Sequence, residues 1–371
     1  MLDRMAKDLA ALRAADQHRD LAIPDGIQLN SNDYLGLSTH PRLKAAIQRA
    51  LEQDDRVGST GSRLLSGNHE RWQSLEAEFA KLVGAAASLY FPSGYAANIG
   101  LLSSVLGPGD TVFSDAANHA SLIDGIRLSR ARKVIFPHRD LNYLEDAMRR
   151  ENSTAGEKVV VVESIFSMEG DRAPIDELIN LCGRHAAWLI VDEAHSTGVD
   201  DPFRRGDRLL ATVHTCGKAL ASMGAFVAGS STLRDFLINR ARTFIFTTAL
   251  PPYCAAHVRE AMILAADADA ARKHLLQLSQ YLRERMRDGG FDTGRSDSQI
   301  IPLVLGSNET ALRYATALSM SGFAVRAIRP PTVPVGTSRI RISLTAKLSK
   351  ADMDSLLDAL VAARETEVVL G

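Results

Sequence analysis

Short apolar runs alternate with amphipathic stretches along the first two thirds of the chain. The runs are ASLYF at 87–91, TVFS at 111–114, KVIF at 133–136, KVVVVES at 158–164, WLIVDEAH at 188–195, Leu209–Val213 and GAFVAG at 224–229. Helical spacing of apolar residues predicts helices that begin near Gly94, Asn118, Asp140 and Ile175. Strands separated by helices predict βαβ units and a large domain with a mainly parallel sheet sandwiched by helices.

The pattern changes near Pro251–Pro252, where a long helical region is predicted to run to about Arg287. The elements predicted beyond it are strands at 299–304, 323–328 and 339–344 and helices near 308–321 and 350–363. They indicate a smaller C-terminal α/β domain with an antiparallel sheet.

At the other end of the chain, helices are predicted over 1–18, 40–54 and 69–83. We therefore expect three parts. They are an N-terminal helix and substrate-side segment over 1–45, a large domain over 46–250, and a linking helix with the small domain over 251–371.

Composition excludes several classes of protein. The 371 residues are 46% hydrophobic and 23% charged, which is typical of a globular chain. With 43 Lys and Arg against 44 Asp and Glu, no basic field indicates nucleic acid. Cys182, Cys216 and Cys254 have no metal or disulfide spacing, so a reducing cytoplasm is expected and no metal site. No apolar stretch predicts a membrane span, and the charged N-terminus is unlike a secretory signal.

Polar residues follow the apolar runs, at the edge where open α/β sheets bind ligands. Ser93 and Gly94 open a helix after the first run, and exposed N–H groups at a helix start favour a phosphate. Tyr95 would face a ring, and His119, in NHAS, would stack on a planar cofactor. Taken alone, the first motif also fits an ordinary strand-to-helix turn, and a lone histidine is more often structural.

Two further motifs follow later strands. Asp192 closes an apolar run, three residues before His195, and a carboxylate there can pair with a protonated ring nitrogen. The letters DEAH also occur in helicases, but Thr212 and Ala219 replace the residues that a phosphate-binding G-x-x-x-x-G-K-[ST] loop requires. Lys218 lies among small and apolar residues, where a lowered pKa would free its amine for Schiff-base chemistry, unless it is simply a surface lysine.

Taken together, the four motifs supply a phosphate cradle, a ring-stacking face, a ring-nitrogen carboxylate and an amine. Thr215, three residues before the lysine, adds a hydroxyl for the phosphate. This combination is what pyridoxal 5′-phosphate (PLP) requires from a protein.

Over nearly its whole length the chain resembles the α-oxoamine synthases, a family of fold-type I PLP enzymes. The motifs that carry the resemblance are NSNDYLGLS at 30–38, GSTGSRLLSGN at 58–68, FPSGYAANIG at 91–100, NHASLIDG at 118–125, ESIFSMEGD at 163–171, VDEAHSTG at 191–198, HTCGKAL at 214–220, FIFTTALPP at 244–252 and RPPTVPVGTSRIRISLTA at 329–346. Their number and shared order make accidental similarity untenable. The resemblance implies a PLP transferase with the cofactor in the large domain.

The resemblance also implies roles for single residues. Lys218 is the Schiff-base lysine and the base that removes the α-proton, while Asp192 pairs with the pyridine nitrogen. His119 stacks on the ring, and either it or His195 is expected to polarise the thioester carbonyl. The further cofactor contacts that the resemblance implies are Gly94, Tyr95, Ser167, His195 and Thr215.

The substrate side and the neighbouring subunit receive the remaining roles. Thr247 and Thr248 reach the phosphate of the neighbouring subunit, which implies a homodimer with shared active sites. Arg341 holds the amino-acid carboxylate, which its planar guanidinium matches. The other residues that the resemblance places near the substrates are Arg19, Asn32, Glu163 and Thr332.

The chain departs from the family pattern in one region. Only 23 residues (218 − 195) separate His195 from Lys218, where relatives usually carry a longer loop with a G-x-x-G-R-G stretch. Cys216 and Ala221 also replace residues usual in the family, the latter a glycine. The contacts of this loop, over 196–214, are therefore not carried over from the resemblance.

Among the activities of this family, the segment at 329–346 and SQIIPLVLG at 298–306 favour the one that belongs to biotin synthesis. That reaction condenses L-alanine with a pimeloyl thioester of coenzyme A or acyl carrier protein and releases carbon dioxide, giving 8-amino-7-oxononanoate. The alternatives are glycine C-acetyl transfer, another amino acid and acyl donor, and a catalytically silent subunit. A nicotinamide oxidoreductase is disfavoured because no G-x-G-x-x-G opens the first βα unit.

Overall fold

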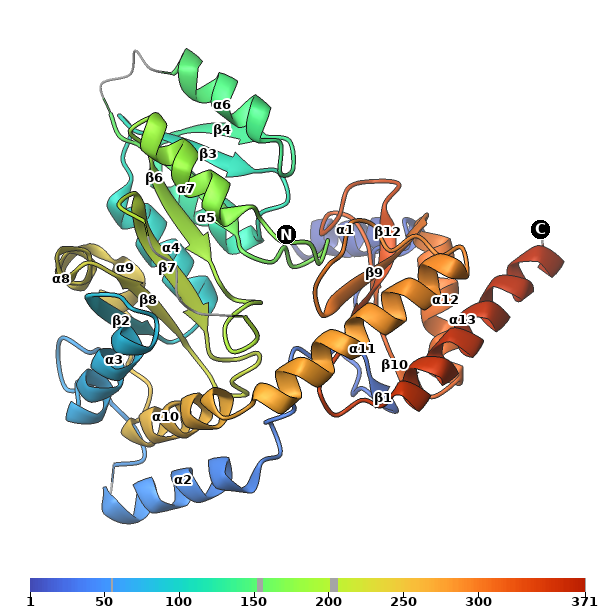
Figure 1. The fold of residues 1–371 in the computed structure, drawn as a ribbon, viewed down its shortest axis with the longest axis horizontal. Helices are drawn as coiled ribbons and strands as arrows, with labels where there is room; N and C mark the ends of the chain where they lie inside the picture. The colour runs from blue at the N-terminus through green and yellow to red at the C-terminus, as the bar shows by residue number, and fades with distance from the viewer. Residues whose placement is uncertain (55, 152–155, 201–205, 371) are drawn as a thin grey trace. The chain divides into compact units, whose positions relative to one another are not determined.

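The computed structural model describes residues 1–54, 56–151, 156–200 and 206–370 of the chain (Figure 1). Two compact units can be distinguished. The large unit comprises Leu35–Ser167 and Arg172–Asp269, and the small unit comprises Met1–Tyr34, Met168–Asp171 and Ala270–Gly371. This division differs from the predicted ranges because residues 35–45 and 251–269 belong to the large unit.

A seven-stranded sheet forms the centre of the large unit (Figure 1). In spatial order its strands are β2 (Ala87–Phe91), β8 (Ala225–Gly229), β7 (Leu209–Thr215), β6 (Trp188–Asp192), β5 (Lys158–Glu163), β3 (Thr111–Asp115) and β4 (Arg132–Phe136). Only β8 runs antiparallel to its two neighbours. The predicted mainly parallel sheet is thus confirmed, and each predicted run contains a strand.

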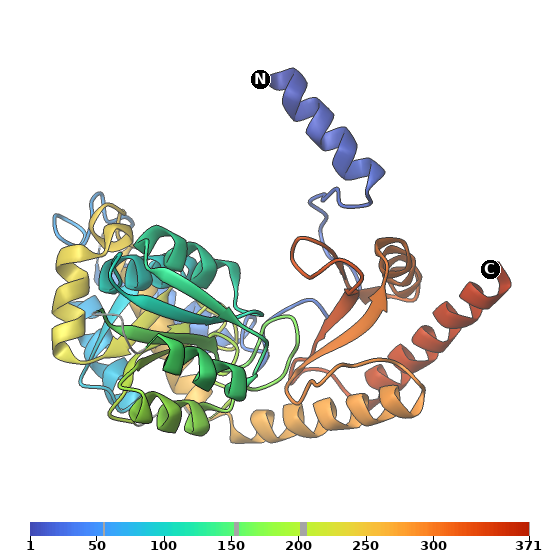
Figure 2. The same ribbon diagram turned by 90° about the horizontal axis from the view of Figure 1, so that it is seen from above.

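Helices cover both faces of this sheet, as Figure 2 shows from above. Successive side chains of a strand point to opposite faces. Val159 and Val161 of β5 therefore pack with α4 (Gly94–Val105), α5 (Ala120–Ser129) and α8 (Ser231–Arg240). Val160 and Val162 pack with α6 (Leu141–Arg150) and α7 (Ile175–Arg184) on the other face. The central strands read as continuous apolar runs because both of their faces are buried.

Of the other helices of the large unit, one packs on β2 and β8 and the rest pack on neighbouring helices. These other helices are α2 (Pro41–Gln53), α3 (Glu70–Leu82), α9 (Arg242–Ile245) and α10 (Pro252–Ala266). Phe79 of α3 stacks on Phe226 of β8, with the ring centroids 3.9 Å apart. This contact anchors α3 to the antiparallel strand.

The small unit contains two sheets (Figure 1). The order of the antiparallel sheet is β11 (Ala327–Ile328), β12 (Ser338–Ser343) and β9 (Ile300–Gly306), and β1 (Ile27–Gln28) pairs in parallel with β10 (Phe323–Ala324). The helices of this unit are α1 (Leu2–Ala14), α11 (Asp269–Asp288), α12 (Asn308–Met320) and α13 (Lys350–Leu370). An antiparallel sheet was predicted for this part of the chain.

Some predicted elements are divided or were missed. The helical region after Pro252 is two helices, because α10 ends at Ala266 and Asp267 caps it with φ −85° and ψ 3°. The predicted strand at 323–328 is divided between β10 and β11, which pair in different sheets. Sequence reasoning also missed α8, α9 and β1. In none of the described segments is a helix both long and apolar enough to cross a membrane.

Ala221 occupies a left-handed backbone conformation, with φ 45°. It closes the turn that carries Lys218, since its N–H donates to the Lys218 carbonyl at 2.8 Å. A side chain in this region strains the backbone, whereas glycine adopts it freely. We therefore expect Ala221→Gly to raise the free energy of unfolding by about 1 kcal/mol.

Denaturant unfolding of the wild type and the variant measures this difference. Ala219→Gly is the matched control, because Ala219 lies in the same turn, is fully buried and has no such strain. It should lower the stability. If Ala221→Gly also lowered it, the turn would not be strained at this residue.

Candidate active site

The carboxyl ends of neighbouring strands bring predicted cofactor residues of the large unit together with Glu163, which was predicted to lie near the substrates. Glu163 ends β5 and pairs in register with Asp192, which ends β6. Thr215 ends β7, and Lys218 follows in the next turn. His119 follows β3 and caps the start of α5. The parallel order of the strands thus places five polar side chains at one edge of the sheet.

Asp192 is a buried carboxylate with two fixed donors. Its Oδ2 accepts from Asn98 Nδ2 at 2.7 Å, and its Oδ1 accepts from the backbone N–H of Ala194 at 2.9 Å. The side chain is only 4% exposed. Two donors on separate oxygens leave lone pairs free, so this carboxylate can still accept a bond from a cationic N–H.

Asn98 was part of a predicted motif but received no role from the sequence. Its amide nitrogen donates to Asp192 and also to Ser121 Oγ, at 2.9 Å. Asn98 lies one turn after Gly94 on α4 and is buried. A polar residue on the sheet-facing side of an apolar helix was the signal that would have identified it.

His119 presents its ring at the same edge. Its Nδ1 accepts from the Ser121 N–H at 3.2 Å, which leaves the proton of the neutral ring on Nε2. Desolvation lowers the pKa of His119, and the charge of Lys218 lowers it further against the opposing effect of Asp192. The ring therefore favours the neutral form, which suits packing against a flat ligand.

Lys218 is held by a turn rather than by a helix or strand. The Ala221 N–H donates to its carbonyl, and the Ser222 N–H donates to the carbonyl of Cys216, both at 2.8 Å. The charge of Lys218 acts on both His119 and Glu163. Its amine therefore lies within electrostatic range of His119, which follows β3, and of Glu163, which ends β5.

Glu163 is a buried acid that favours its neutral form. Burial raises its pKa to about 8, with a further rise from Asp192, opposed by Lys218 and by backbone N–H groups. Its Oε2 accepts from the Ser167 N–H at 3.1 Å. Across the described part of the chain, its Oε1 has no hydrogen-bond partner although it is buried.

The raised pKa of Glu163 predicts how the stability of the protein depends on pH. Folded Glu163 keeps its proton up to about pH 8, while an unfolded chain loses it near 4.5, so folding takes up a proton between these values. Stability is therefore lost as the pH rises through this window. Because glutamine cannot ionise, we expect the free energy of unfolding of Glu163→Gln to rise relative to that of the wild type by about 2 kcal/mol between pH 6 and pH 8.

Denaturant unfolding of both cofactor-free proteins at pH 6 and pH 8 measures this effect. Glu157→Gln serves as the control, because Glu157 is exposed to solvent rather than buried. If the wild type and Glu163→Gln lost equal stability between the two pH values, folded Glu163 would not be the neutral acid inferred here.

A phosphate cradle lies at the start of α4. Ser93 Oγ caps the helix by accepting from the Ala96 N–H at 3.1 Å. A Cβ atom at Gly94 would lie 2.4 Å from Thr215 Cγ2, so a side chain there would collide with the end of β7. Helix N–H groups, a glycine and a neighbouring hydroxyl fit a phosphate group. Tyr95, in the first turn of α4, is 45% exposed and donates its hydroxyl to Asp124 of α5.

The remaining predicted cofactor residues of this edge are buried beside it. Ser167 is held to Glu163 through its backbone, and His195 lies in the turn after β6 and is 5% exposed. The set fits PLP. It offers a cradle that a Cβ would fill, a buried carboxylate, a neutral imidazole, an amine and the unpartnered Oε1 of Glu163.

Apart from Glu163, the predicted substrate residues form two pairs in the small unit. Arg341 Nη1 and Nη2 each lie 3.2 Å from Asn32 Oδ1, and Nη1 also donates to Ser343 Oγ at 2.7 Å. Arg19 Nη2 donates to Thr332 Oγ1 at 3.2 Å. Residues far apart in the sequence are thus brought together as two polar pairs.

Thr247 and Thr248 belong to the loop between α9 and α10. They follow α9 and line a cavity of about 20 Å³ with Trp72 and Tyr90. Among the described residues, neither threonine has a hydrogen bond to the cluster around Lys218. Their predicted role concerns the neighbouring subunit and stays a prediction.

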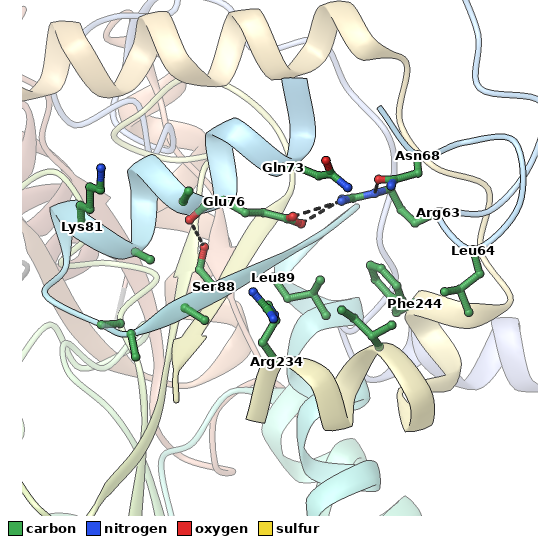
Figure 3. Close-up of a pocket in the computed structure, with 16 residues that line it drawn as sticks. Arg63, Leu64, Asn68, Gln73, Glu76, Lys81, Ser88, Leu89, Arg234 and Phe244 are labelled. Carbon is green, nitrogen blue, oxygen red and sulfur yellow. Dashed lines mark hydrogen bonds and ion pairs between the residues drawn. The ribbon is translucent and has the colours of Figure 1, made fainter. Parts of the chain in front are cut away.

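A cavity of about 560 Å³ lies elsewhere in the large unit, beside α3 and β2 (Figure 3). Arg63 and Glu76 form an ion pair in it, at 2.9 and 3.1 Å. None of the predicted site residues lines this cavity. Over the described ranges, no group of three or more His, Cys, Asp or Glu side chains is arranged to hold a metal. The shortened segment at 196–214 is described except for 201–205, which lie outside the described residues.

Comparisons with known proteins identify the family of this chain. The model of the aminotransferase class I and II family matches residues 24–360. An 8-amino-7-oxononanoate synthase of Marinobacter nauticus is 43% identical over 343 residues, which cover 90% of this chain and 86% of that protein.

Two solved structures are similar in fold. A serine palmitoyltransferase from S. paucimobilis, determined with bound PLP and myriocin, has a TM-score of 0.89 and 28% identity and covers 99% of this chain and 98% of its own. The 8-amino-7-oxononanoate synthase of Francisella tularensis has a TM-score of 0.79 and 27% identity, with 93% and 99% covered. The chain therefore belongs to the aminotransferase class I and II family, in its α-oxoamine synthase branch of PLP-dependent acyltransferases.

Proposed function

We propose that this enzyme condenses L-alanine with a pimeloyl thioester, releasing the thiol and carbon dioxide and forming 8-amino-7-oxononanoate for biotin synthesis. The observation that carries the proposal is the 43% identity to an 8-amino-7-oxononanoate synthase over 90% of the chain. The cluster of Lys218, Asp192 and His119 supports it, because a catalytically silent subunit has no need of this set.

Three residues of the large unit would have separate roles in the reaction. Bound PLP would draw electrons from the α-carbon of the amino acid. The buried carboxylate of Asp192 would hold a proton on the pyridine nitrogen, and the neutral ring of His119 would cover one face and exclude water. The amine of Lys218 would take the α-proton and later return one to the same carbon after carbon dioxide leaves.

Binding groups hold the substrates in place for these steps. Arg341 would bind the alanine carboxylate through its guanidinium fork, which Asn32 orients. Fixing that carboxylate aims the α-hydrogen at one base and orients the bond to the leaving carbon dioxide. The thiol of the acyl donor leaves with a proton as the new carbon–carbon bond forms.

An α-oxoamine synthase with a different amino acid and acyl donor is the second candidate. The TM-score of 0.89 to a serine palmitoyltransferase favours it, since it exceeds the 0.79 to an 8-amino-7-oxononanoate synthase. Sequence identity favours the first candidate instead. The chain is 43% identical to an 8-amino-7-oxononanoate synthase but 28% identical to this serine palmitoyltransferase. Glycine C-acetyl transfer is the third choice within the same chemistry.

Thiol release from pimeloyl-CoA by PLP-loaded enzyme decides among these functions. L-alanine, glycine and L-serine are compared at equal concentration. We expect rapid release with L-alanine alone. Release with glycine or serine only would overturn the substrate assignment, and no release with any of them would overturn the proposed function.

We further propose that the enzyme is a cytoplasmic homodimer in which Thr247 and Thr248 complete the phosphate site of the partner subunit. Co-expression of Lys218→Ala with a Thr247→Ala/Thr248→Ala chain tests this arrangement. A mixed dimer would contain one site with an intact lysine and intact threonines, so the mixture should be more active than either variant alone. Activity no higher than the sum of the two separate variants would contradict shared sites.

A further inference from the structure

Two arginines from opposite ends of the sequence converge in the small unit. Arg329 donates from Nη1 to the carbonyl of Asp16, and from Nη2 to the carbonyl of His18 at 3.0 Å. Arg19, the next residue, donates from Nη2 to Thr332 Oγ1 at 3.2 Å. A single guanidinium thus ties the backbone just before Arg19 to the loop that carries Thr332.

Other contacts hold the same segment in place. Asn308 Nδ2 donates to the carbonyl of Ala15 at 2.9 Å, and Asn308 Oδ1 accepts from Ser338 Oγ at 2.7 Å. The segment before Arg19 therefore has a fixed partner on α12, which β12 holds in turn, as well as partners on the Arg329 loop. A surface segment that only connected two elements would not need this many fixed partners.

The two guanidiniums repel each other. Burial lowers the pKa of Arg329, and the charge of Arg19 lowers it further, against an opposing effect of Asp16. Asp20 follows Arg19 in the sequence, but its carboxylate lies 3.2 Å from His18 Nδ1 and is paired there. An anion bound between the two guanidiniums would reduce their electrostatic repulsion. Guanidinium groups match the oxygens of carboxylates and phosphates in geometry.

We propose that Arg329 is a positioning residue that sets Arg19 and Thr332 as a clamp for an anionic group of the acyl thioester. The proposal rests on the proposed function, because a pimeloyl thioester carries a carboxylate at the far end of its acyl chain. The phosphates of coenzyme A offer the same chemistry. The clamp binds one of these two groups, and substrates that lack one or the other distinguish them.

Three thioesters separate the sources of the anion. Pimeloyl-CoA carries both groups, heptanoyl-CoA lacks the distal carboxylate, and pimeloyl-N-acetylcysteamine lacks the phosphates. The KM of each thioester and kcat are measured for PLP-loaded wild type and for Arg329→Ala and Arg329→Lys. Lysine keeps the charge but cannot span two carbonyls as a fork does.

Arg326→Ala is the matched control. Arg326 is exposed between β10 and β11, and it also donates to the N-terminal segment, to the carbonyl of Ala22 at 3.3 Å. Its hydrogen bond to that segment is made at Ala22, after Arg19, whereas the bonds of Arg329 are made before Arg19. If tethering of the segment alone mattered, the two alanine variants would behave alike.

For Arg329→Ala we expect the KM for pimeloyl-CoA to rise by about tenfold to a hundredfold, with kcat and the KM for L-alanine little changed. A similar rise with pimeloyl-N-acetylcysteamine but not with heptanoyl-CoA would identify the carboxylate. A rise with both CoA thioesters only would identify the phosphates. Arg329→Lys should be partly impaired, and Arg326→Ala should match the wild type.

An equal change with all three thioesters, or no change, would overturn the clamp. Failure of the proposed function is distinguishable, because the wild type would then release no thiol from pimeloyl-CoA with L-alanine. If the wild type were active but Arg329→Ala changed the KM of all three thioesters equally, only this inference would be rejected and the proposed function would stand.

Discussion

Lys218→Ala is expected to lose product formation by about 10⁴-fold or more, with the fold retained. The variant removes the only amine that the structure places among Asp192, His119 and Glu163 within the described residues. Without it, the cofactor has no covalent attachment, and the α-proton has no base. Thiol release with L-alanine and pimeloyl-CoA measures the loss.

Borohydride reduction provides a second readout for the same variant. In the wild type it should fix the cofactor to the peptide that contains Lys218, and in Lys218→Ala it should fix none. Lys133→Ala is the control, because Lys133 is exposed on β4, at the edge of the sheet. Cofactor fixed to another lysine, with activity retained in Lys218→Ala, would contradict the assignment.

Asp192→Asn is expected to lower kcat by about 10²- to 10³-fold. Asparagine has nearly the same shape but carries no charge, so it no longer holds a proton on the pyridine nitrogen. The buried site, with Asp192 4% exposed, gives water little access to replace that charge. Both kcat and the absorbance of the bound cofactor as a function of pH should change.

Asn98→Ala is the graded comparison for this variant. It removes the 2.7 Å donor to Asp192 Oδ2 but leaves the carboxylate and its Ala194 donor in place. Its loss of kcat should be smaller than that of Asp192→Asn. A kcat at the wild-type level in Asp192→Asn with bound cofactor would show that the carboxylate does not act on the ring nitrogen.

The sheet of the large unit could be predicted because burial on both faces leaves a plain signature. The four valines of β5 form an unbroken apolar run, and Glu163 marks its end. The first polar residues after such runs then identify candidate site residues. That Glu163 pairs with Asp192 was not predictable, because the register between two strands depends on how the whole sheet packs.

Several features lay outside the reach of sequence reasoning for physical reasons. Apolar spacing continues across Asp267, so the break between α10 and α11 left no signal in the pattern. The role of Asn98 depends on how α4 docks on β6. Arg329 binds backbone carbonyls more than three hundred positions away along the chain, and a backbone acceptor carries no side-chain signature.

Carboxyl-labelled L-alanine offers the most direct test of decarboxylative condensation by this enzyme. Labelled carbon dioxide and free thiol are measured together with pimeloyl-CoA and PLP-loaded protein. We predict equal amounts of the two, none of either without the thioester, and none in Lys218→Ala. Thiol release without labelled carbon dioxide would mean simple thioester hydrolysis or acyl transfer, and would contradict the proposed reaction.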